Sequence, residues 1–497
     1  NSEYPRIPFF YESRRGLAAT PQRPATVWES SVEQFDNFDE VVPADDSDSL
    51  EFTLASKTRE AIRWVVDLGA LLIGSSGGVW VVGGSGQQEL LTANSIACRR
   101  LSNLGCADLA PAEAGDAVFF VEAKGGAPRL VERGDSGGLR ITDPSLLARH
   151  LFDGYTIVGW AFAESPHQVL WAARSDGVLL SFTYVAELEI LAWAKHEISG
   201  SGLVEAVCCK PEGAEDAVWM LVNRGGARSI ERMAYRLFPL TSAGDPDVRY
   251  CIFLDRAVSY NGKSTENTQA TVTVDTPAAY AVGEPLTVTF STPVWNPAVG
   301  QTFSVDADDG GLPYRFVATV DNGASNFTCQ LLSRDIAAAD CPSAADYWLC
   351  KSSASGLGHL EGLTVTVVAD GDVYEGITVT GGSATIDPTG GGLLVAGMLH
   401  AGLPYVSDFE SLDVQNKDGR QKIVKRVSVE LEHTRGGEVG PDLDNLVEIQ
   451  TRTTSHGYLS LPLRRVEESE VVNDEYGKGG RVAVRQSAPM PMMILGI

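Results

Sequence analysis

Short segments in which apolar and polar residues alternate dominate the chain, and Gly-rich or Asp-Gly turns separate them. Alternation with a period of two is typical of strands, and Gly and Asp between two such runs indicate hairpins. Four segments of the first half share a strand, turn, strand pattern: residues 71–73 and 80–82, 118–120 and 130–131, 169–171 and 180–182, and 218–220 and 230–232. A weaker fifth copy runs from 16–18 to 27–28. We therefore expect five hairpins.

The hairpins recur at a nearly constant interval. Those beginning at residues 71, 118, 169 and 218 are 47 to 51 residues apart, close to the roughly 40 to 50 residues of a four-stranded propeller blade. One hairpin cannot bury both faces of its sheet, so successive blades must stack face to face. We expect Trp80, Trp171 and Trp219 to fill the space between blades. The alternative is a meander of unrelated hairpins in a sandwich.

The pattern predicts an all-β protein in three regions. Residues 1–260 form the propeller-like region, and alternating Thr and Val with Gly and Asn turns predict a small inserted β-domain at 264–355. Residues 356–497 form a C-terminal β-sandwich or platform, with a strand at 427–432. The apolar tail at 490–495 is too short to span a membrane and is expected to be an edge strand or a subunit contact. One helix is expected, with Asp143 as its cap and Leu146, Leu147, His150 and Leu151 on one face.

Composition and charge narrow the classes of function. The 51 Gly and 24 Pro suit many tight turns, and 44% apolar with 21% charged residues excludes disordered and coiled-coil proteins. The net charge of -26 repels phosphate at long range, so a groove-reading DNA-binding protein is not expected. The polar start at Asn1 is unlike a secretory leader, and a chain that starts without Met is expected to be a processed or incomplete product.

Cysteine and histidine spacing favours no metal site. The eight cysteines lack C-x-x-C pairs and histidines at zinc spacing, and the seven histidines lack an i, i+4 pair. Cysteines in apolar strand contexts, such as Cys208 and Cys209, are expected to be buried thiols of a reducing compartment. Local pairing among Cys329, Cys341 and Cys350 is the less favoured alternative.

Several short motifs suggest chemistry that their context does not support. Residues 134–138 (Gly-Asp-Ser-Gly-Gly) match the loop of a nucleophilic serine, but the first histidine, His150, follows Ser136, and strand patterns flank the motif where a hydrolase elbow needs a following helix. A hairpin turn explains these residues.

The Arg-Gly-Asp string at 133–135 carries almost no information. Asp306, Asp308 and Asp309 beside Gly310 lack the order of a calcium loop, and the sequon at Asn326 matters only in a secreted chain. We therefore expect no catalytic, cofactor-binding or metal-binding residues.

Several strings, in order along the chain, resemble the tail nozzle family of short-tailed bacteriophages, also called tail tubular protein B. The strings are residues 14–17, 27–30, 35–38, 61–64, 75–82, 169–171 with 176–177, 230–233 and 356–362. The resemblance covers about 14–255 and resumes at 356 to roughly 435. Gly358 stands where the family commonly has Asp. Family members carry a few hundred residues before the first string, which implies that this chain is a C-terminal portion or a shortened variant.

The resemblance implies a structural virion protein and no enzyme. It implies a homo-hexameric nozzle ring that closes the tail tip, assembles in the host cytoplasm and contacts the tail adaptor or tubular ring above it and the tail fibres or spikes. The resemblance also implies that genomic DNA passes through the lumen during ejection without sequence-specific binding, and it implies no cofactor. The alternative from another class is a β-propeller that binds or hydrolyses glycans, for which 65 acidic residues always offer a carboxylate pair. Ring assembly distinguishes the two.

Overall fold

Antiparallel sheets make up nearly all of the regular structure, so the all-β prediction is confirmed. The computed structural model describes residues 4–83, 90–134, 138–188, 190–240, 244, 246–263, 271–291, 297–306, 313–386, 395–412, 424–449, 463–471 and 480–497. These residues form two compact units, Asn1–Met233 and Ala234–Ile497.

The first unit contains five successive sheets in the described residues, each built from strands adjacent in the sequence. The first two are β1 (Ile7–Tyr11), β2 (Arg14–Ala18), β3 (Thr26–Glu29) and β4 (Leu50–Thr53), then β5 (Ile62–Asp67), β6 (Leu71–Ser75), β7 (Gly78–Gly83) and β8 (Ala97–Ser102). The next two are β9 (Ala112–Ala114), β10 (Ala117–Val121), β11 (Pro128–Arg133) and β12 (Leu139–Thr142), then β13 (Ile157–Ala163), β14 (Val169–Arg174), β15 (Leu179–Val185) and β16 (Ile190–His196). The fifth is β17 (Leu203–Glu212), β18 (Glu215–Arg224) and β19 (Ala227–Arg232).

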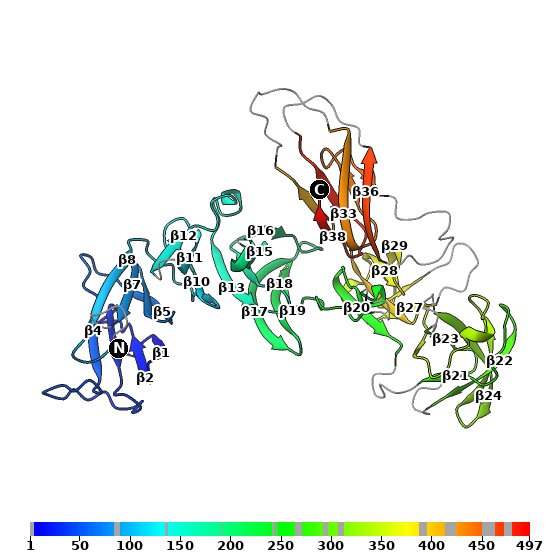
Figure 1. The fold of residues 1–497 in the computed structure, drawn as a ribbon, viewed down its shortest axis with the longest axis horizontal. Helices are drawn as coiled ribbons and strands as arrows, with labels where there is room; N and C mark the ends of the chain where they lie inside the picture. The colour runs from blue at the N-terminus through cyan, green and yellow to red at the C-terminus, as the bar shows by residue number, and fades with distance from the viewer. Residues whose placement is uncertain are drawn as a thin grey trace. The chain divides into compact units, whose positions relative to one another are not determined.

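All five expected hairpins are confirmed by the strand pairs β2–β3, β6–β7, β10–β11, β14–β15 and β18–β19. Neighbouring sheets pack face to face, and Figure 1 shows them following one another from β1 to β19. Side chains that alternate along one strand therefore enter two different cores. In β6, Leu71 and Ile73 pack toward the first sheet, whereas Leu72 packs toward the third. Burial on both faces explains why β6, β10 and β14 are buried at every position.

The tryptophan prediction is correct at two of its three positions. Trp80 lies between the first and second sheets, and Trp171 lies between the fourth and fifth. Trp219 is only half-buried. Val218 and Met220 enter the core between the fourth and fifth sheets, whereas Trp219, which is in register with Cys208, lies on the other face of the fifth sheet. The expectation for Trp219 is wrong.

The expected helix after Asp143 is also wrong. Only the 3-10 turn η1 (Arg149–Leu151) forms, and Leu146 and Leu147 are 60% and 95% exposed. The side chain of Asp143 accepts from the backbone N–H of Ser145 at 3.0 Å and from its hydroxyl at 2.6 Å, and it pairs with Arg129 at 2.7 Å. These bonds stabilise a local turn around Asp143 in place of a first helical turn.

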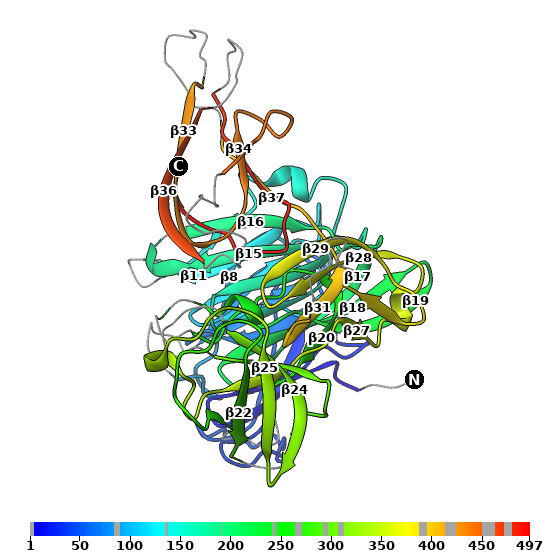
Figure 2. The same cartoon turned by 90° about the vertical axis from the view of Figure 1, so that its right-hand side faces the viewer.

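The second unit begins with a four-stranded sheet and a six-stranded sheet. The four-stranded sheet has the order β20 (Asp255–Asn261), β31 (Met398–Leu403), β28 (Thr364–Ala369) and β29 (Asp372–Thr378). The six-stranded sheet has the order β21 (Val272–Val274), β22 (Pro285–Phe290), β25 (Asn326–Leu331), β24 (Tyr314–Gly323), β23 (Thr302–Val305) and β26 (Tyr347–Leu349). It lies between β20 and β28 in the sequence and has its own aromatic core around Phe290 and Phe303. Figure 2 shows β22, β24 and β25 of this sheet.

The remaining strands form one small pair and a two-sheet sandwich. The pair is β27 (Ser353–Ser355) with β30 (Ser383–Thr385). One sheet of the sandwich is β32 (Ser407–Glu410), β37 (Ala483–Gln486), β34 (Glu438–Gly440) and β35 (Val447–Glu448), and the other is β36 (Arg464–Val471), β33 (Arg426–Thr434) and β38 (Met493–Gly496). Val429 of β33 and Val484 of β37 belong to the shared core. The apolar tail is an edge strand, as expected, because β38 pairs only with β33 among the strands that the structure describes.

Short 3-10 turns complete the described structure: η2 (Ala186–Leu188), η3 (Val248–Tyr250), η5 (Ala338–Asp340) and η6 (Gly358–Leu360). All eight cysteines are free thiols, so the local pairing of Cys329, Cys341 and Cys350 does not occur. Cys208 is exposed, which corrects the expectation that it is buried. In the described residues, no helix is long and apolar enough to cross a membrane.

Candidate functional site

The motifs singled out in the sequence do not converge on one site. The strands that flank the Gly-Asp-Ser-Gly-Gly string pair as β11 and β12, and the N–H of Gly134 donates to the carbonyl of Gly138 at 2.7 Å. The hairpin around this string is therefore confirmed, whereas Asp135, Ser136 and Gly137 lie outside the described residues, as do Asp308, Asp309 and His456. No group of three or more potential metal ligands occurs in the part of the chain that the structure describes.

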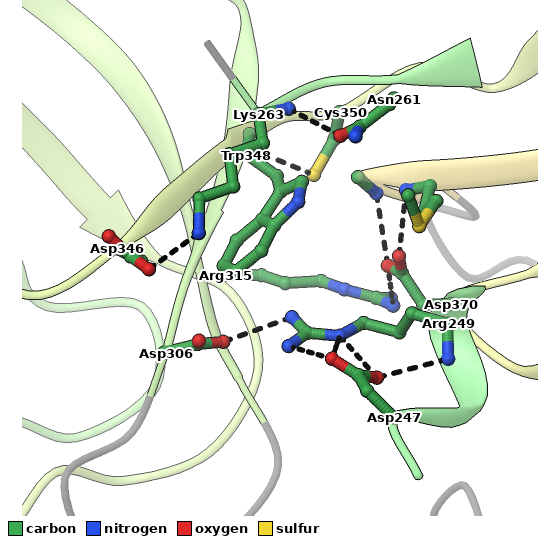
Figure 3. A network of polar contacts seen from close by, with 12 residues as sticks. Asp247, Arg249, Asn261, Lys263, Asp306, Arg315, Asp346, Trp348, Cys350 and Asp370 are labelled. Atoms are coloured by element: carbon green, nitrogen blue, oxygen red, sulfur yellow. Dashed lines mark hydrogen bonds and ion pairs between the residues drawn. The ribbon is translucent and has the colours of Figure 1, made fainter. Parts of the chain in front are cut away.

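A network of charged side chains in the second unit brings together residues from Asp247 to Asp370 (Figure 3). Arg249, in the turn η3, is its centre. Its guanidinium donates to Asp247 at 2.8 to 3.1 Å and to Asp306 at 3.0 Å, so it bridges η3 and the end of β23. The side chain of Asp247 also caps η3 by accepting from the backbone N–H of Arg249 at 3.0 Å. One local turn thus orients the guanidinium toward the six-stranded sheet.

Trp348 of β26 lies between two cations of this network. The guanidinium of Arg249 lies 4.2 Å from its ring centroid, and the ammonium of Lys263 lies 4.9 Å from it. The indole is 2% exposed, and its Nε1 has no hydrogen-bond partner. An unsatisfied buried N–H costs about 1 to 3 kcal/mol, which two cation–π contacts of about 0.5 to 2 kcal/mol each can offset. Lys263 also donates to Asp346 at 2.6 Å.

Asp370 forms the other end of the network, at the turn between β28 and β29. Its carboxylate pairs with Arg315 at 3.2 Å and accepts from the backbone N–H groups of Gly397 and Met398 at 3.0 and 2.8 Å. Burial raises the pKa of Asp370 above its ordinary value, and Arg315 opposes the shift. Burial lowers the pKa of Arg249, but the hydrogen bond to Asp247 and the charge of Asp306 outweigh burial and raise it overall. Each of these carboxylates has a cationic partner.

This arrangement is suited to holding two sheets together. The nearby Cys350 thiol has a pKa raised to about 12 by burial, so it is protonated and a poor nucleophile at neutral pH. Nearby His400 is buried, and burial lowers the pKa of its ring. The ring is fixed between the Ser259 hydroxyl and the Arg249 carbonyl, each at 2.7 Å. A cavity of about 470 Å³ next to the network is lined by residues that include Thr302, Val317 and Lys351. The lining also includes Cys350, Ser352 and Ser353.

The first unit contains a different unusual group, the carboxylate of Glu29 on β3. The residue is fully buried, and neither carboxylate oxygen has a hydrogen-bond partner. Burial raises the pKa of Glu29 to about 8, with Arg14 opposing and Glu12 supporting the shift. The nearby guanidinium of Arg14 is itself buried and donates to the carbonyls of Ser30 at 2.7 Å and Asp46 at 2.8 Å. Glu29 is therefore largely protonated at neutral pH.

Sequence reasoning missed both features. The pattern Asp247-x-Arg249 is a detectable capping turn, but its partners Asp306 and Trp348 are set by the fold and not by spacing. Glu29 lies in a string that we treated as part of a strand, and its lack of a hydrogen bond depends on how Arg14 is engaged.

No family model matches the chain, and no curated protein matches it. Among solved structures, the crystal structure of Chaetomium thermophilum Raptor is similar to this chain with 12% identity and a TM-score of 0.30. The match covers 67% of this chain and 28% of that chain, so this chain spans less than a third of that protein's length. A likeness of this degree carries no argument about fold or function.

Proposed function

We propose that the chain is a structural subunit of the tail tip of a short-tailed bacteriophage, a nozzle ring that conducts genomic DNA during ejection. The ordered series of strings that resembles the nozzle family carries the proposal. The ring is homo-hexameric in this proposal, with the tail adaptor above it and fibres or spikes at its side.

The positions of these strings in the fold support a structural role. Arg14, in the first string, is 1% exposed and anchors the loop after β3 through backbone carbonyls. Trp64 of β5, in another string, is 2% exposed and contacts Phe120 of the third sheet at a ring separation of 5.7 Å. Buried residues of this kind set how sheets pack, whereas an enzyme's shared residues gather in a cleft.

The string at residues 75–82 gives a second example. The hydroxyl of Ser75 donates to Glu60 at 2.6 Å, and the indole of Trp80 donates to the same carboxylate at 3.3 Å. Arg100 pairs with Glu60 and lies 4.5 Å from the Trp80 ring centroid. Although burial raises the pKa of Glu60, these hydrogen bonds and the charge of Arg100 lower it overall. The string thus closes one sheet around a satisfied buried charge.

The acidity of the chain suits a conduit. A net charge of -26 repels phosphate, and a lumen of like charge leaves the duplex hydrated and free to slide. Native mass spectrometry of the full chain, alone and with tail proteins of the particle that contains it, tests the proposal. We expect a closed ring of six copies. A chain that stays monomeric inside assembled tails would contradict it, and hydrolysis of a glycan by the purified chain would favour the alternative enzyme.

A further inference from the structure

The five sheets of the first unit form a row in which neighbouring sheets pack face to face. In the described residues, the first and the fifth sheet therefore each have one face that no other sheet of the row covers. Among the described residues, each inner sheet of the row is covered on both faces, but the first sheet shares a core only with the second, and the fifth only with the fourth. The other face of the first sheet we call the first end face, and it presents Phe10, Leu17 and Trp28. The other face of the fifth sheet we call the last end face, and it presents Trp219, Leu221 and Ile230.

Strand register fixes which side chains share these faces. Leu17 of β2 pairs with Trp28 of β3, so both project to one side, while Ala18 and Val27 enter the core. Leu221 of β18 pairs with Ile230 of β19 in the same way, while Val222 enters the opposite core. Phe10 is 69% exposed and Ile230 is 75% exposed. Large apolar side chains on an otherwise solvated sheet face are typical of interaction surfaces.

The loop that borders the first end face is ordered and strongly acidic. Residues 31–49 contain seven Asp or Glu and no Lys, Arg or His. The loop is held by Arg14 through the Asp46 carbonyl, by Val32 N–H to the Ser47 carbonyl at 2.9 Å, and by Ser49 to the Asp39 carbonyl at 2.7 Å. Its Phe35 ring contacts Phe10 edge to face at 5.7 Å, which extends the apolar surface. The loop therefore presents a fixed, negatively charged border.

The border of the last end face carries basic and acidic residues in equal number. Lys210, Arg228 and Arg232 lie on β17 and β19 beside the apolar residues, and the side chain of Arg228 is 59% exposed. Glu205 pairs with Arg228, and both Glu212 and Glu215 pair with Arg232. Lys210 is exposed, so the three basic residues balance the three acidic ones. The two end faces thus match in apolar content, and the last end face lacks the excess of negative charge that the loop gives the first.

We propose that the last end face of one copy packs on the first end face of a second copy, head to tail. The contact continues between chains the sheet-on-sheet packing that already joins the five sheets within one chain. A head-to-tail contact uses two different surfaces, and it closes into a ring when the rotation between copies allows it. This inference rests on the ring proposed above, and it assigns the surfaces that form that ring.

The native thiol of Cys208 allows a direct test. Cys208 is exposed, and its register with Trp219 places it on the last end face. Pro8→Cys puts a second thiol on the exposed side of β1, on the same face as Phe10. A short bismaleimide should join P8C chains into dimers and higher species across a concentration series. Adding Cys208→Ser should abolish these species, and Leu147→Cys, a 95% exposed site away from both end faces, should give only the wild-type background.

Ile230→Glu gives an independent measurement. It should weaken self-association in sedimentation velocity at least roughly tenfold, because it places a charge in the apolar contact, while the unfolding midpoint stays the same. Cross-links within single chains would show that the two end faces close on each other, and the inference would fail. No cross-links above the L147C background would also overturn it. If either of these two results were found but the chain still formed a ring at the tail tip, the inference about the end faces would fail and the proposed function would stand. If the cross-linked oligomers formed but the chain were missing from the tail tip, the proposed function would fail and the inference about the end faces would stand.

Discussion

Replacing the buried carboxylate of Glu29 by an amide, Glu29→Gln, should stabilise the first unit in a pH-dependent way. Burial raises the pKa of Glu29 to about 8 from 4.5, so the folded state holds the proton more tightly than the unfolded state does. At about 1.36 kcal/mol per pKa unit, this difference corresponds to at most roughly 5 kcal/mol. The stability that the protonated carboxyl contributes is fully present below pH 4.5 and is lost as the pH rises to about 8.

The variant keeps a neutral side chain at every pH and therefore avoids this loss. Its free energy of unfolding should match that of the wild type near pH 4.5. Above pH 4.5, the difference between the variant and the wild type should grow by up to about 1.4 kcal/mol per pH unit. Above pH 8 the difference should be constant. Partial relaxation around Arg14 would reduce the plateau. The linkage equation makes the sign definite, because the unfolded state binds fewer protons than the folded state in this window.

Urea unfolding followed by tryptophan fluorescence measures this effect, because seven of the nine tryptophans lie in the first unit. Glu40→Gln, which removes a carboxylate from the exposed loop after β3, is the matched control and should follow the wild type. A difference between E29Q and wild type that is the same at pH 5 and pH 8.5 would refute the assignment of Glu29 as a buried, protonated carboxyl.

Three further perturbations test the packing, the charged network and the proposed conduit. Leu72→Ala should lower the free energy of unfolding of the first unit by about 2 to 5 kcal/mol, because Leu72 is fully buried between the second and third sheets. Leu147→Ala, at an exposed position, should change it by less than about 0.5 kcal/mol. Urea unfolding of the two variants measures the difference. Asp370→Ala should lower the local stability around β31 by about 3 to 5 kcal/mol, because it leaves Arg315 and two backbone N–H groups without their carboxylate partner. Amide hydrogen exchange in β31 should become faster as a result. Fluorescence anisotropy with labelled duplex DNA should detect no binding at physiological salt, and tight binding with a steep salt dependence would contradict a non-gripping lumen.

Strand positions could be predicted from the sequence because the alternation of side chains is a local property. The hairpins β6–β7 and β14–β15 follow directly from apolar runs around Gly and Asp-Gly turns. The side of the sheet that a residue occupies could be predicted less well. Trp219 resembles Trp171 in sequence context, yet its register places it on the opposite kind of face.

The failures have physical causes that no local pattern contains. The segment after Asp143 has helical spacing, but the pairing of Asp143 with Arg129 of a neighbouring strand and its bonds to Ser145 favour a turn. The charged network depends on contacts between residues such as Arg249 and Asp306, which are 57 positions apart. The protonation of Glu29 depends on burial, which only the stacked sheets create.

Single-particle imaging of tails that carry this chain tests the central proposal most directly. Under the proposed function, the images show six copies in a ring at the tail tip, with an axial channel wide enough for duplex DNA and lined mainly by carboxylates. A chain located elsewhere in the particle, or a ring whose channel is blocked by folded domains or lined by Lys and Arg, would contradict the account.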